Sequence, residues 1–526
     1  MKRSPGFPRT AGLVWLLFFV RINSRRPRRR RRRSESVTNM KQADVVIIGG
    51  GIVGAAIARE LSRYQLDIVL LEAETDVAMG TSKANSAILH AGFDAKPGTW
   101  KGRLNVQGNA LYHQMEEELR LHIKWTGSLV VARHAADLKV LEQLLERGRQ
   151  NGVPGLALLS QAELLEREPN LDGSVAGALW APTAGIICPF GATFAFAENA
   201  IRNGAVVLRE TAALGIELEA GRVSGVRTER GTIKTRYIVN AAGVMADDIA
   251  RMAGDDSFSI KARKGEYILF DRSVGGLVNS VIFPTPDPIS KGVLISPTVH
   301  GNLFIGPDAQ DVDDKSDTAA TVAGMDRIIS GARNLLPDLP LAAAITQFSG
   351  LRAAAGDGDF ILRESGVGGL IHAAGIQSPG LTAAPAIALV VCDLLREAGL
   401  EQREKTGFVA VNPARPLFGE LSWPQRTRLI EADPRYGRII CRCETVTEAE
   451  IVEAIHAPCG ARTVDGVKRR VRAGSGRCQG GFCGPRVAAI LARELELPLT
   501  QVRKDSIDSY LFVDKMPGSC EVTDRE

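Results

Sequence analysis

The segment Val45-Val46-Ile47-Ile48-Gly49-Gly50-Gly51-Ile52-Val53-Gly54 decides the fold of this chain. Its first four residues form an apolar run, as expected for a parallel strand that is buried on both faces. Gly49, Gly51 and Gly54 then satisfy the spacing G-x-G-x-x-G at the start of a helix. The first glycine permits a tight turn, the second lets the backbone approach a pyrophosphate, and the third lets helix and strand pack closely. The segment therefore predicts the first unit of a Rossmann-type dinucleotide-binding domain.

A second apolar strand, Ile68 to Leu71, ends at Glu72, 18 residues after Gly54. A carboxylate at this place can accept both hydroxyl groups of an adenosine ribose, and it would repel the additional phosphate of NADP. The helix that begins after the glycine turn offers free N–H groups and partial positive charge to the phosphates. An ordinary glycine turn is the alternative, but strand, turn, helix, second strand and acid follow here in the expected order. The motif alone does not choose between FAD and NAD.

The composition is that of a globular protein, because 45% of the 526 residues are hydrophobic and 24% are charged. The length predicts two to four domains. The net charge of +5 is misleading, because residues 1–39 carry twelve Lys and Arg against the single acid Glu35. The rest of the chain sums to −6, which argues against nucleic acid as a partner.

The basic leader, residues 1–39, pairs an apolar run, Ala11 to Val20, with an arginine block. The run is about half the length needed to cross a bilayer. It fits a membrane-surface anchor, an export signal, or an upstream extension that is disordered or not native to the working protein. We favour the extension, because Met40 stands where a compact enzyme of this type would begin. No segment has the length of a transmembrane helix, so we expect a cytoplasmic protein with at most a peripheral membrane association through a partner.

Hydrophobic periodicity divides the remaining chain into two folded regions. Residues 44–405 show strand–turn–helix units, with strands at 277–365 that suit an antiparallel sheet, which indicates an α/β fold. Residues 406–436 hold several prolines and few periodic positions, and are predicted to be a linker. A small cysteine module follows at 437–492, and a tail at 493–526.

One further run resembles the flavin-contacting loop of the D-amino-acid oxidase superfamily: Gly80-Thr81-Ser82-Lys83-Ala84-Asn85-Ser86-Ala87-Ile88-Leu89-His90-Ala91-Gly92-Phe93. Three other segments agree with that superfamily, at 182–186, 240–243 and 349–360. The closing segment, His372 to Thr382, resembles its last FAD-binding turn.

This resemblance implies a Rossmann-type FAD-binding domain, an antiparallel-sheet substrate domain and FAD as the cofactor. The cofactor-binding residues that it implies, together with the glycine turn, are Gly49, Gly51, Gly54, Glu72, Thr81, Ser82, Ala242, Gly243, Gly375, Ser378, Gly380, Leu381 and Thr382.

Two residues are candidates for the chemistry of a flavin enzyme that oxidises a secondary alcohol. His90 can accept the hydroxyl proton, because its ordinary pKa lies near neutrality, or it only binds the flavin or packs. Arg352 suits an anionic handle of the substrate, because its planar fork grips a phosphate or carboxylate with two hydrogen bonds; the alternative is a surface ion pair. Lys264 is a second candidate for the anion, with a structural role favoured.

Within the superfamily, the chain is similar to FAD-dependent glycerol-3-phosphate dehydrogenases and to L-2-hydroxyglutarate dehydrogenases. One departure keeps both substrates open. Aerobic glycerol-3-phosphate enzymes carry a lysine in the final flavin turn, whereas this turn reads Gln377-Ser378-Pro379-Gly380 and holds no cation. Arg352 alone does not distinguish glycerol-3-phosphate from a 2-hydroxy acid, because both substrates are small anions.

The cysteine module contains Cys441-Arg442-Cys443 and, after 34 residues, Cys478-Gln479-Gly480-Gly481-Phe482-Cys483. Structural zinc sites favour cysteine pairs with two to four intervening residues, whereas a 2Fe–2S cluster spreads four thiolates over two irons. The module resembles the bacterioferritin-associated ferredoxin type of 2Fe–2S domain, which implies Cys441, Cys443, Cys478 and Cys483 as metal ligands. Zinc or an empty site is the alternative.

Other residues of the module and the remaining cysteines have simpler interpretations. We expect a helix near Gly484 to point its positive end at the cluster. We expect the thiolate charge to be offset by five basic residues, Lys468, Arg469, Arg470, Arg472 and Arg477. The other four cysteines, Cys188, Cys392, Cys459 and Cys520, are interpreted as structural.

The two-part chain is similar to the large catalytic subunit of anaerobic glycerol-3-phosphate dehydrogenase. This similarity implies oxidation of glycerol-3-phosphate to dihydroxyacetone phosphate, with electrons leaving through the cluster to a partner protein or a quinone-linked subunit. The alternatives are an L-2-hydroxyglutarate or other 2-hydroxy or amino acid dehydrogenase, and a non-catalytic electron-transfer subunit.

Overall fold

The computed structural model describes residues 41–286, 292–356 and 358–513. The predicted leader, residues 1–39, and Cys520 lie outside the described residues. Within the described ranges, no helix combines the length and the apolar character needed to span a membrane.

A six-stranded sheet forms the nucleotide-binding region, in the order β20-β21-β13-β1-β2-β9. All neighbouring strands run parallel except β20, which runs antiparallel to β21. The strands are β1 (Val45–Ile48), β2 (Ile68–Leu71), β9 (Val206–Leu208), β13 (Tyr237–Asn240), β20 (Ile361–Glu364) and β21 (Leu370–Ala374). Both β1 and β2 are buried at every residue, and their central place confirms the predicted Rossmann-type domain.

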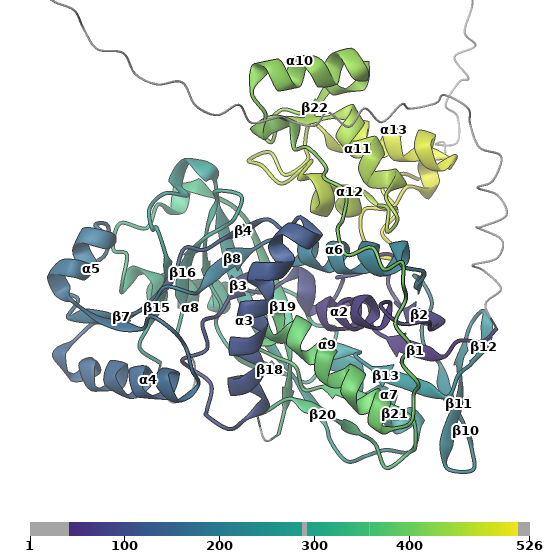
Figure 1. Ribbon diagram of the computed structural model, residues 1–526. Helices are drawn as coiled ribbons and strands as arrows, with labels where there is room; N and C mark the ends of the chain where they lie inside the picture. The colour runs from purple at the N-terminus through teal and green to yellow at the C-terminus, as the bar shows by residue number, and fades with distance from the viewer. Residues whose placement is uncertain (1–40, 287–291, 357, 514–526) are drawn as a thin grey trace, which may run out of the picture. The chain divides into compact units, whose positions relative to one another are not determined.

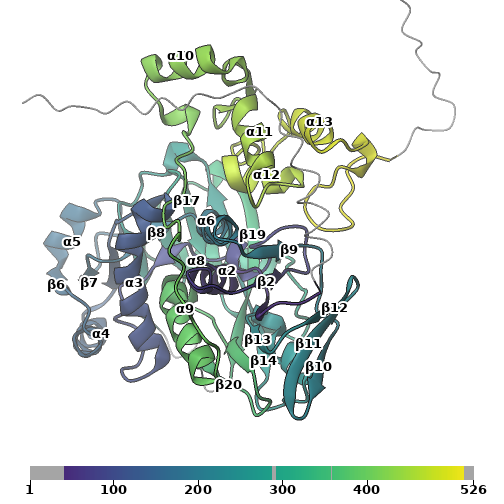
Figure 2. The same cartoon turned by 45° about the vertical axis from the view of Figure 1, so that its right-hand side comes forward.

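Three helices cover this sheet around the glycine turn. Helix α2 (Ile52–Leu61) is buried along its whole length and packs between α6 (Pro189–Arg202) and α9 (Gly380–Glu397), as Figures 1 and 2 show. Helix α3 (Trp100–Leu119) packs against α9. Its residue Gly108 permits this approach, because a Cβ there would lie 2.1 Å from the carbonyl oxygen of Thr382.

The second large sheet has nine strands, in the order β18-β14-β17-β16-β15-β5-β7-β6, with β19 pairing with β14. The strands are β5 (Ser128–Ala132), β6 (Ala157–Ser160), β7 (Gly177–Ala181), β14 (Ile260–Phe270), β15 (Val281–Pro284), β16 (Leu294–Pro297), β17 (Leu303–Gly306), β18 (Gln310–Val312) and β19 (Ala344–Ala355). Its pairs are antiparallel except β15 with β5, which is parallel. The antiparallel sheet predicted at 277–365 is therefore only partly right. Its strands β15 to β19 join four earlier strands, β5, β6, β7 and β14, whereas β20 belongs to the six-stranded sheet.

Alternate residues of this sheet face two different hydrophobic cores. Leu129 and Val131 of β5 pack in the same core as Ile328 of α8 (Val322–Arg333). Val130 of the same strand packs on the opposite face, in a core that includes Phe93 of the predicted flavin loop. This period of two places one face of the sheet against the nucleotide-binding region.

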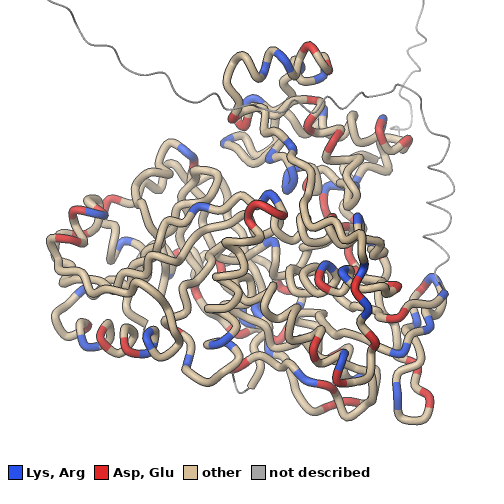
Figure 3. Tube along the Cα trace, in the orientation of Figure 1, with Lys and Arg blue, Asp and Glu red and all other residues tan. Residues whose placement is uncertain are grey.

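The smaller elements lie around these two sheets. One three-stranded sheet consists of β3 (Ile88–Leu89), β8 (Gly185–Ile187) and β4 (Ile123–Lys124), and another of β10 (Gly215–Glu219), β11 (Arg222–Thr228) and β12 (Gly231–Lys234). Outer helices are α4 (Leu138–Gln150), α5 (Gln161–Arg167) and α7 (Ala246–Met252). Charged residues gather on outer elements such as α4, α5 and the β10–β12 sheet, whereas the sheet interiors carry few (Figure 3).

The predicted small α-rich module is present at the C-terminal end of the described chain. It consists of the hairpin β22 (Ile439–Cys441) and β23 (Val446–Thr447) with helices α11 (Glu448–His456), α12 (Val464–Val471) and α13 (Gly484–Leu495). The three helices lie together in both views (Figures 1 and 2). They enclose a core of their own, which includes Ile451, Val467 and Leu491.

Two boundary predictions need correction. The predicted linker, 406–436, contains helix α10 (Trp423–Ala432), whose capping box is made by Ser422 and Gln425. Pro424 suggested a break, but it stands in the first helical turn, where a missing N–H costs nothing. The predicted tail at 493–526 packs in its described part, because Val502 is buried in the core of the module.

Candidate functional site

The glycine turn after β1 leaves room for a ligand at one position only. A Cβ on Gly49, where φ is 109°, would lie 2.4 Å from the carbonyl oxygen of Ala241. A Cβ on Gly54 would lie 2.0 Å from the carbonyl oxygen of Gly49. At Gly51 the nearest atom is Ser82 Oγ at 3.2 Å, and no other atom lies within 4 Å. The turn is therefore closely packed at Gly49 and Gly54 and leaves open space at Gly51, as a pyrophosphate site requires.

The other predicted nucleotide contacts lie along the same edge of the parallel sheet. Glu72 follows β2, Ala242 and Gly243 follow β13, and Gly375 follows β21. Glu72 Oε2 accepts a hydrogen bond from the Gly50 N–H at 2.9 Å. Ligands of open α/β sheets bind at the carboxyl ends of the strands, so the fold brings these residues together although they are far apart in sequence.

Two hydroxyl groups fix the beginning of the flavin loop. Ser82 Oγ accepts the N–H of Ile52 at 2.9 Å, at the N-terminus of α2. Thr81 Oγ1 donates to the carbonyl oxygen of Leu351 in β19 at 2.5 Å. Gly350 allows this contact, because a Cβ there would lie 2.0 Å from the carbonyl oxygen of Ala84. The loop is thus attached to helix α2 and to the nine-stranded sheet.

His90 lies where the flavin loop meets the start of α9. Its backbone N–H donates to Thr382 Oγ1 at 2.9 Å, and its Nε2 lies 3.3 Å from Ser378 Oγ. The predicted residues Gly380, Leu381 and Thr382 form the first turn of α9. Asn109, which the sequence did not single out, donates to the carbonyl oxygen of His90 at 3.2 Å. The backbone of His90 is therefore held by two helices.

Aromatic side chains of the nine-stranded sheet face the flavin loop. Tyr267 stacks on Phe348, with ring centroids 4.7 Å apart, and its hydroxyl lies 3.4 Å from Ser86 Oγ. Phe283 lies 6.0 Å from the His90 ring. No sequence signal identified these residues, because they come from strands separated by many positions. They give the histidine side of the site an apolar wall.

Arg352 lies on the same face of the sheet as these aromatic residues. Side chains two residues apart on a strand share a face, so Arg352, Gly350 and Phe348 project together. Arg352 Nη2 donates to the carbonyl oxygen of Asp308 at 2.9 Å, which orients the guanidinium. Lys264 pairs with Leu351 in register and projects from the opposite face, where its Nζ donates to Asp317 at 2.8 Å. The structural interpretation of Lys264 is therefore the better one.

The four predicted cluster ligands lie together as two pairs. Cys443 Sγ and Cys478 Sγ are 3.7 Å apart, close to the separation of about 3.8 Å expected for two sulfurs on one tetrahedral metal ion. In the other pair, a hydrogen bond with Cys483 holds the pKa of the Cys441 thiol below its ordinary value. Among the described residues, no three His, Cys, Asp or Glu side chains converge on one metal position. Two separate pairs fit a two-iron cluster better than a single zinc ion.

Residues 44–394 match the model of the FAD dependent oxidoreductase family. The chain belongs to that family. FAD is therefore its cofactor, and the open space at Gly51 fits the pyrophosphate of that group. Residues 439–493 of the oxidoreductase match the BFD-like 2Fe–2S binding domain, which agrees with the paired thiolates.

Individual relatives agree with both parts. The oxidoreductase is 49% identical over 472 residues to a glycerol 3-phosphate dehydrogenase of Caloramator mitchellensis, covering 89% of this chain and 98% of that one. It is 33% identical over 302 residues to human mitochondrial L-2-hydroxyglutarate dehydrogenase, covering 54% of this chain and 65% of the human protein. Among solved structures it is similar to dithionite-reduced, FAD-bound L-alpha-glycerophosphate oxidase of Mycoplasma pneumoniae, with a TM-score of 0.68, 29% identity, and coverage of 72% and 100% of the two chains.

The arginines of the cysteine module do not serve the thiolates in the way we expected. The four arginines each bind a carboxylate: Arg469 binds Asp505, Arg470 binds Asp76, Arg472 binds Glu444 and Arg477 binds Asp271. Lys468 Nζ donates to Gln479. The predicted charge compensation is therefore seen at Arg477, which also interacts electrostatically with Cys443. The other basic side chains connect parts of the module with one another and with the flavin domain.

Asp76 is the centre of the contact between the two parts of the oxidoreductase. It follows β2 by five residues, and its carboxylate accepts from Arg470 Nη1 at 2.5 Å and Nη2 at 2.9 Å. Both side chains are buried, with 1% of Asp76 and 4% of Arg470 exposed. Burial alone would raise the pKa of Asp76, but Arg470 and Arg209 outweigh it and hold the pKa below its ordinary value. Lys83 of the flavin loop also reaches the module, through Asp505 at 3.1 Å.

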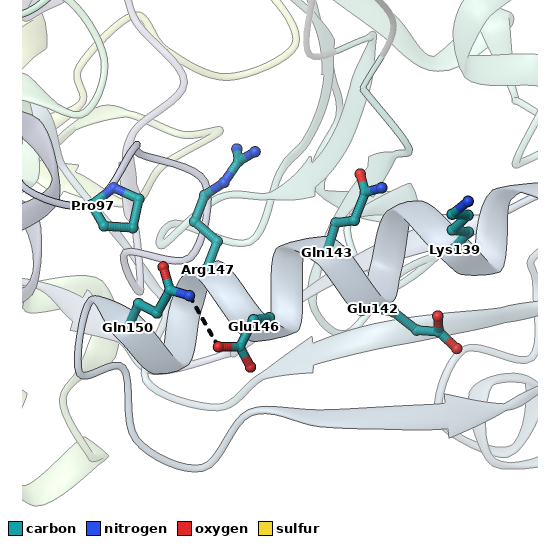
Figure 4. Close-up of a pocket in the computed structure, with 7 residues that line it drawn as sticks. All are labelled: Pro97, Lys139, Glu142, Gln143, Glu146, Arg147 and Gln150. Atoms are coloured by element: carbon teal, nitrogen blue, oxygen red, sulfur yellow. Dashed lines mark hydrogen bonds between the residues drawn. The ribbon is translucent and has the colours of Figure 1, made fainter.

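A surface hollow beside α4 contains none of these residues. It is lined by Pro97 and by polar or charged side chains of α4, among which Gln150 donates to Glu146 at 3.0 Å (Figure 4). Such side chains are typical of a solvated helix face. We assign the hollow no role.

The FAD affinity of the apoprotein is expected to rise with pH through neutrality. Burial raises the pKa of Glu72 from 4.5 to about 7, so the protonated carboxyl stabilises the apoprotein at low pH and this contribution is lost as the pH rises through 7. Ribose hydroxyl groups need the ionised acceptor, so FAD should bind about tenfold more tightly at pH 8 than at pH 6. Fluorescence titration measures this. Equal pH dependence in Glu72→Gln would contradict the role of Glu72.

Asp76→Asn is expected to loosen the module from the flavin domain. The change leaves the buried Arg470 without its charge partner, which costs about 3–5 kcal/mol. Calorimetry should then resolve a separate early unfolding of the module, and protease should cleave near 406–436 sooner than in the native protein. Asp393→Asn, at an exposed helical ion pair, is the matched control and should leave both readouts unchanged. A single unchanged transition in Asp76→Asn would show that the pair does not hold the parts together.

Proposed function

We propose that the oxidoreductase is a glycerol-3-phosphate dehydrogenase whose electrons leave through a 2Fe–2S cluster to a protein or quinone-linked acceptor. The observation that carries the proposal is Arg352 on the sheet face that also lines the loop of His90, within a chain that ends in a cluster module. The relative from Caloramator mitchellensis supports it, because the similarity covers 98% of that protein and so includes the cysteine module.

In this proposal each residue of the site has a separate role. Arg352 grips the phosphate with two hydrogen bonds and orients the substrate. His90 takes the hydroxyl proton through Nε2, with Ser378 as its neighbour. Tyr267, Phe283 and Phe348 exclude water from the reacting carbon. When bound, FAD supplies the hydride acceptor and the cluster supplies a one-electron exit.

We further propose roles for the nucleotide contacts and for the location. Gly49, Gly51 and Gly54 would hold the pyrophosphate, Glu72 the ribose, and the ends of β13 and β21 the rest of FAD. The catalytic domain is proposed to span residues 44–405, and the cluster domain to begin at 437 and to include the following segment whose Val502 lies in its core. A cytoplasmic location, at the inner face of the membrane if the acceptor subunit is bound there, belongs to the same proposal.

A 2-hydroxy acid is the second candidate substrate. Two observations favour it: Gln377 to Gly380 supply no cation to a phosphate, and the human L-2-hydroxyglutarate dehydrogenase is 33% identical over the matched part. A non-catalytic electron-transfer subunit is disfavoured, because the candidate proton acceptor and the candidate anion contact are both present.

Anaerobic titration of the FAD-loaded protein separates these functions. Glycerol-3-phosphate should bleach the yellow flavin absorption, whereas L-2-hydroxyglutarate should not. Arg352→Met should lower kcat/KM for glycerol-3-phosphate roughly 100-fold, because two charge-assisted hydrogen bonds of about 1.5 kcal/mol each are lost. Arg149→Glu, on the exposed face of α4, is the control. Bleaching by the hydroxy acid alone would overturn the substrate assignment, and bleaching by neither would favour the electron-transfer subunit.

A further inference from the structure

One large aromatic side chain of the oxidoreductase is left in solvent beside the cluster ligands. Phe482 is 84% exposed, and among the described large hydrophobic residues only Val513 is more exposed. A single exposed apolar residue is common on protein surfaces and carries no meaning alone. The position of Phe482 is what matters, because it lies between the ligands Cys478 and Cys483.

The backbone and the side chain of Phe482 point to different tasks. Its N–H hydrogen-bonds Cys478, which contributes to the lowered pKa of that thiol. Its ring contributes nothing to the core of the module, which is filled by residues such as Ile451 and Leu491. The loop therefore holds a ligand sulfur with its backbone and presents the ring to the surroundings.

The segments that carry the cluster ligands also carry positive charge. Residues 475–486 contain Arg477 and Arg486 and no Asp or Glu. Arg442, between the first two ligands, and Arg486 are both exposed, and neither pairs with a carboxylate within the part of the chain that the structure describes. Of the nearby acids, Asp271 pairs with Arg477, and the side chain of Glu444 is only 2% exposed, because Arg272 and Arg472 enclose it. We call Arg442, Arg477, Phe482 and Arg486 the cluster face.

Cys443 lies at this surface as well, since it is exposed whereas Cys441 and Cys483 are buried. The cluster would therefore be nearest to solvent at the cluster face. Aromatic residues and arginine are enriched at protein interfaces, and electron-transfer complexes are small and short-lived, with charge setting the association rate. An exposed apolar ring near exposed arginines, of which Arg442 and Arg486 have no carboxylate partner among the described residues, is complementary to an acidic protein.

We propose that the cluster face is the docking surface for an acidic one-electron carrier protein. The proposal rests on the proposed function in one respect, because it requires a redox-active cluster at the four cysteines. Each substrate molecule supplies two electrons and releases two protons to solvent, so two carriers are reduced one after the other. Phe482 would form the apolar centre of the contact, and the arginines its rim.

The test uses the holoprotein and two carriers of opposite charge. An acidic plant-type ferredoxin is the main probe, and basic cytochrome c is the comparison. Binding is measured by biolayer interferometry, and electron transfer by stopped-flow mixing of reduced ferredoxin with oxidised holoprotein, or of dithionite-reduced holoprotein with cytochrome c. Neither readout needs the substrate, so a wrong substrate assignment does not affect the result.

Arg486→Glu should weaken ferredoxin binding roughly tenfold and slow its electron transfer, while it accelerates the reaction with cytochrome c. Phe482→Ser should weaken ferredoxin binding by a similar factor, with less change in its salt dependence. The matched controls are Arg149→Glu and Val322→Ser, at exposed positions of α4 and α8. They should change neither the binding nor the electron-transfer rate of either carrier. The visible spectrum of each variant verifies that the cluster is retained. If Phe482→Ser loses the cluster, the docking proposal is tested by Arg486→Glu alone.

Ferredoxin that does not bind, or that binds equally well to Arg486→Glu, would overturn the docking proposal. Tighter binding of cytochrome c than of ferredoxin to the native protein would overturn it too. A holoprotein without any cluster spectrum would instead contradict the proposed function, so the two failures are distinguishable.

Discussion

The ion pair of Asp76 with Arg470 is the constraint on which the arrangement of the oxidoreductase depends. A carboxylate buried to this degree is unstable without a cation, and the cation comes from a helix almost 400 residues later in the chain. Asp76 follows β2 closely, so the segment from Glu72 to Lys83 combines three contacts. It places Glu72 against the glycine turn, Asp76 against the cluster module, and Thr81 against β19. The flavin loop and the module therefore take up their positions together.

The second constraint is the common edge of the parallel strands. Each parallel strand of the six-stranded sheet places its following loop at the same edge, so residues of four distant segments lie together without any direct sequence relation. The nine-stranded sheet closes the site from the other side with one of its two faces. Gly350 marks the place where loop and sheet come too close for a side chain. The result is a polar histidine loop opposite an apolar wall, with Arg352 on the same face.

Much of this was predictable because its causes are local. The tight turn at Gly49 and the close approach at Gly54 need glycine for reasons that hold within one strand–helix unit, and the cysteine spacing reflects ligand geometry. The partners of Arg470 and Arg469 were not predictable, since their carboxylates are distant in sequence and the thiolates were the nearest visible charge. The aromatic wall was missed because Tyr267 and Phe348 become neighbours only through strand pairing. Helix α10 was missed because Pro424 stands in its first turn, and the sequence alone does not distinguish such a proline from one that ends a helix.

We propose that electrons pass within this one chain from the flavin to a cluster at the four cysteines. Rapid freeze-quench electron paramagnetic resonance tests it most directly, after anaerobic mixing of the holoprotein with glycerol-3-phosphate. The signal of the reduced cluster should develop within the same turnover in which the flavin absorption bleaches. A bleached flavin beside a cluster that stays oxidised, in protein with a full complement of iron, would contradict the claim.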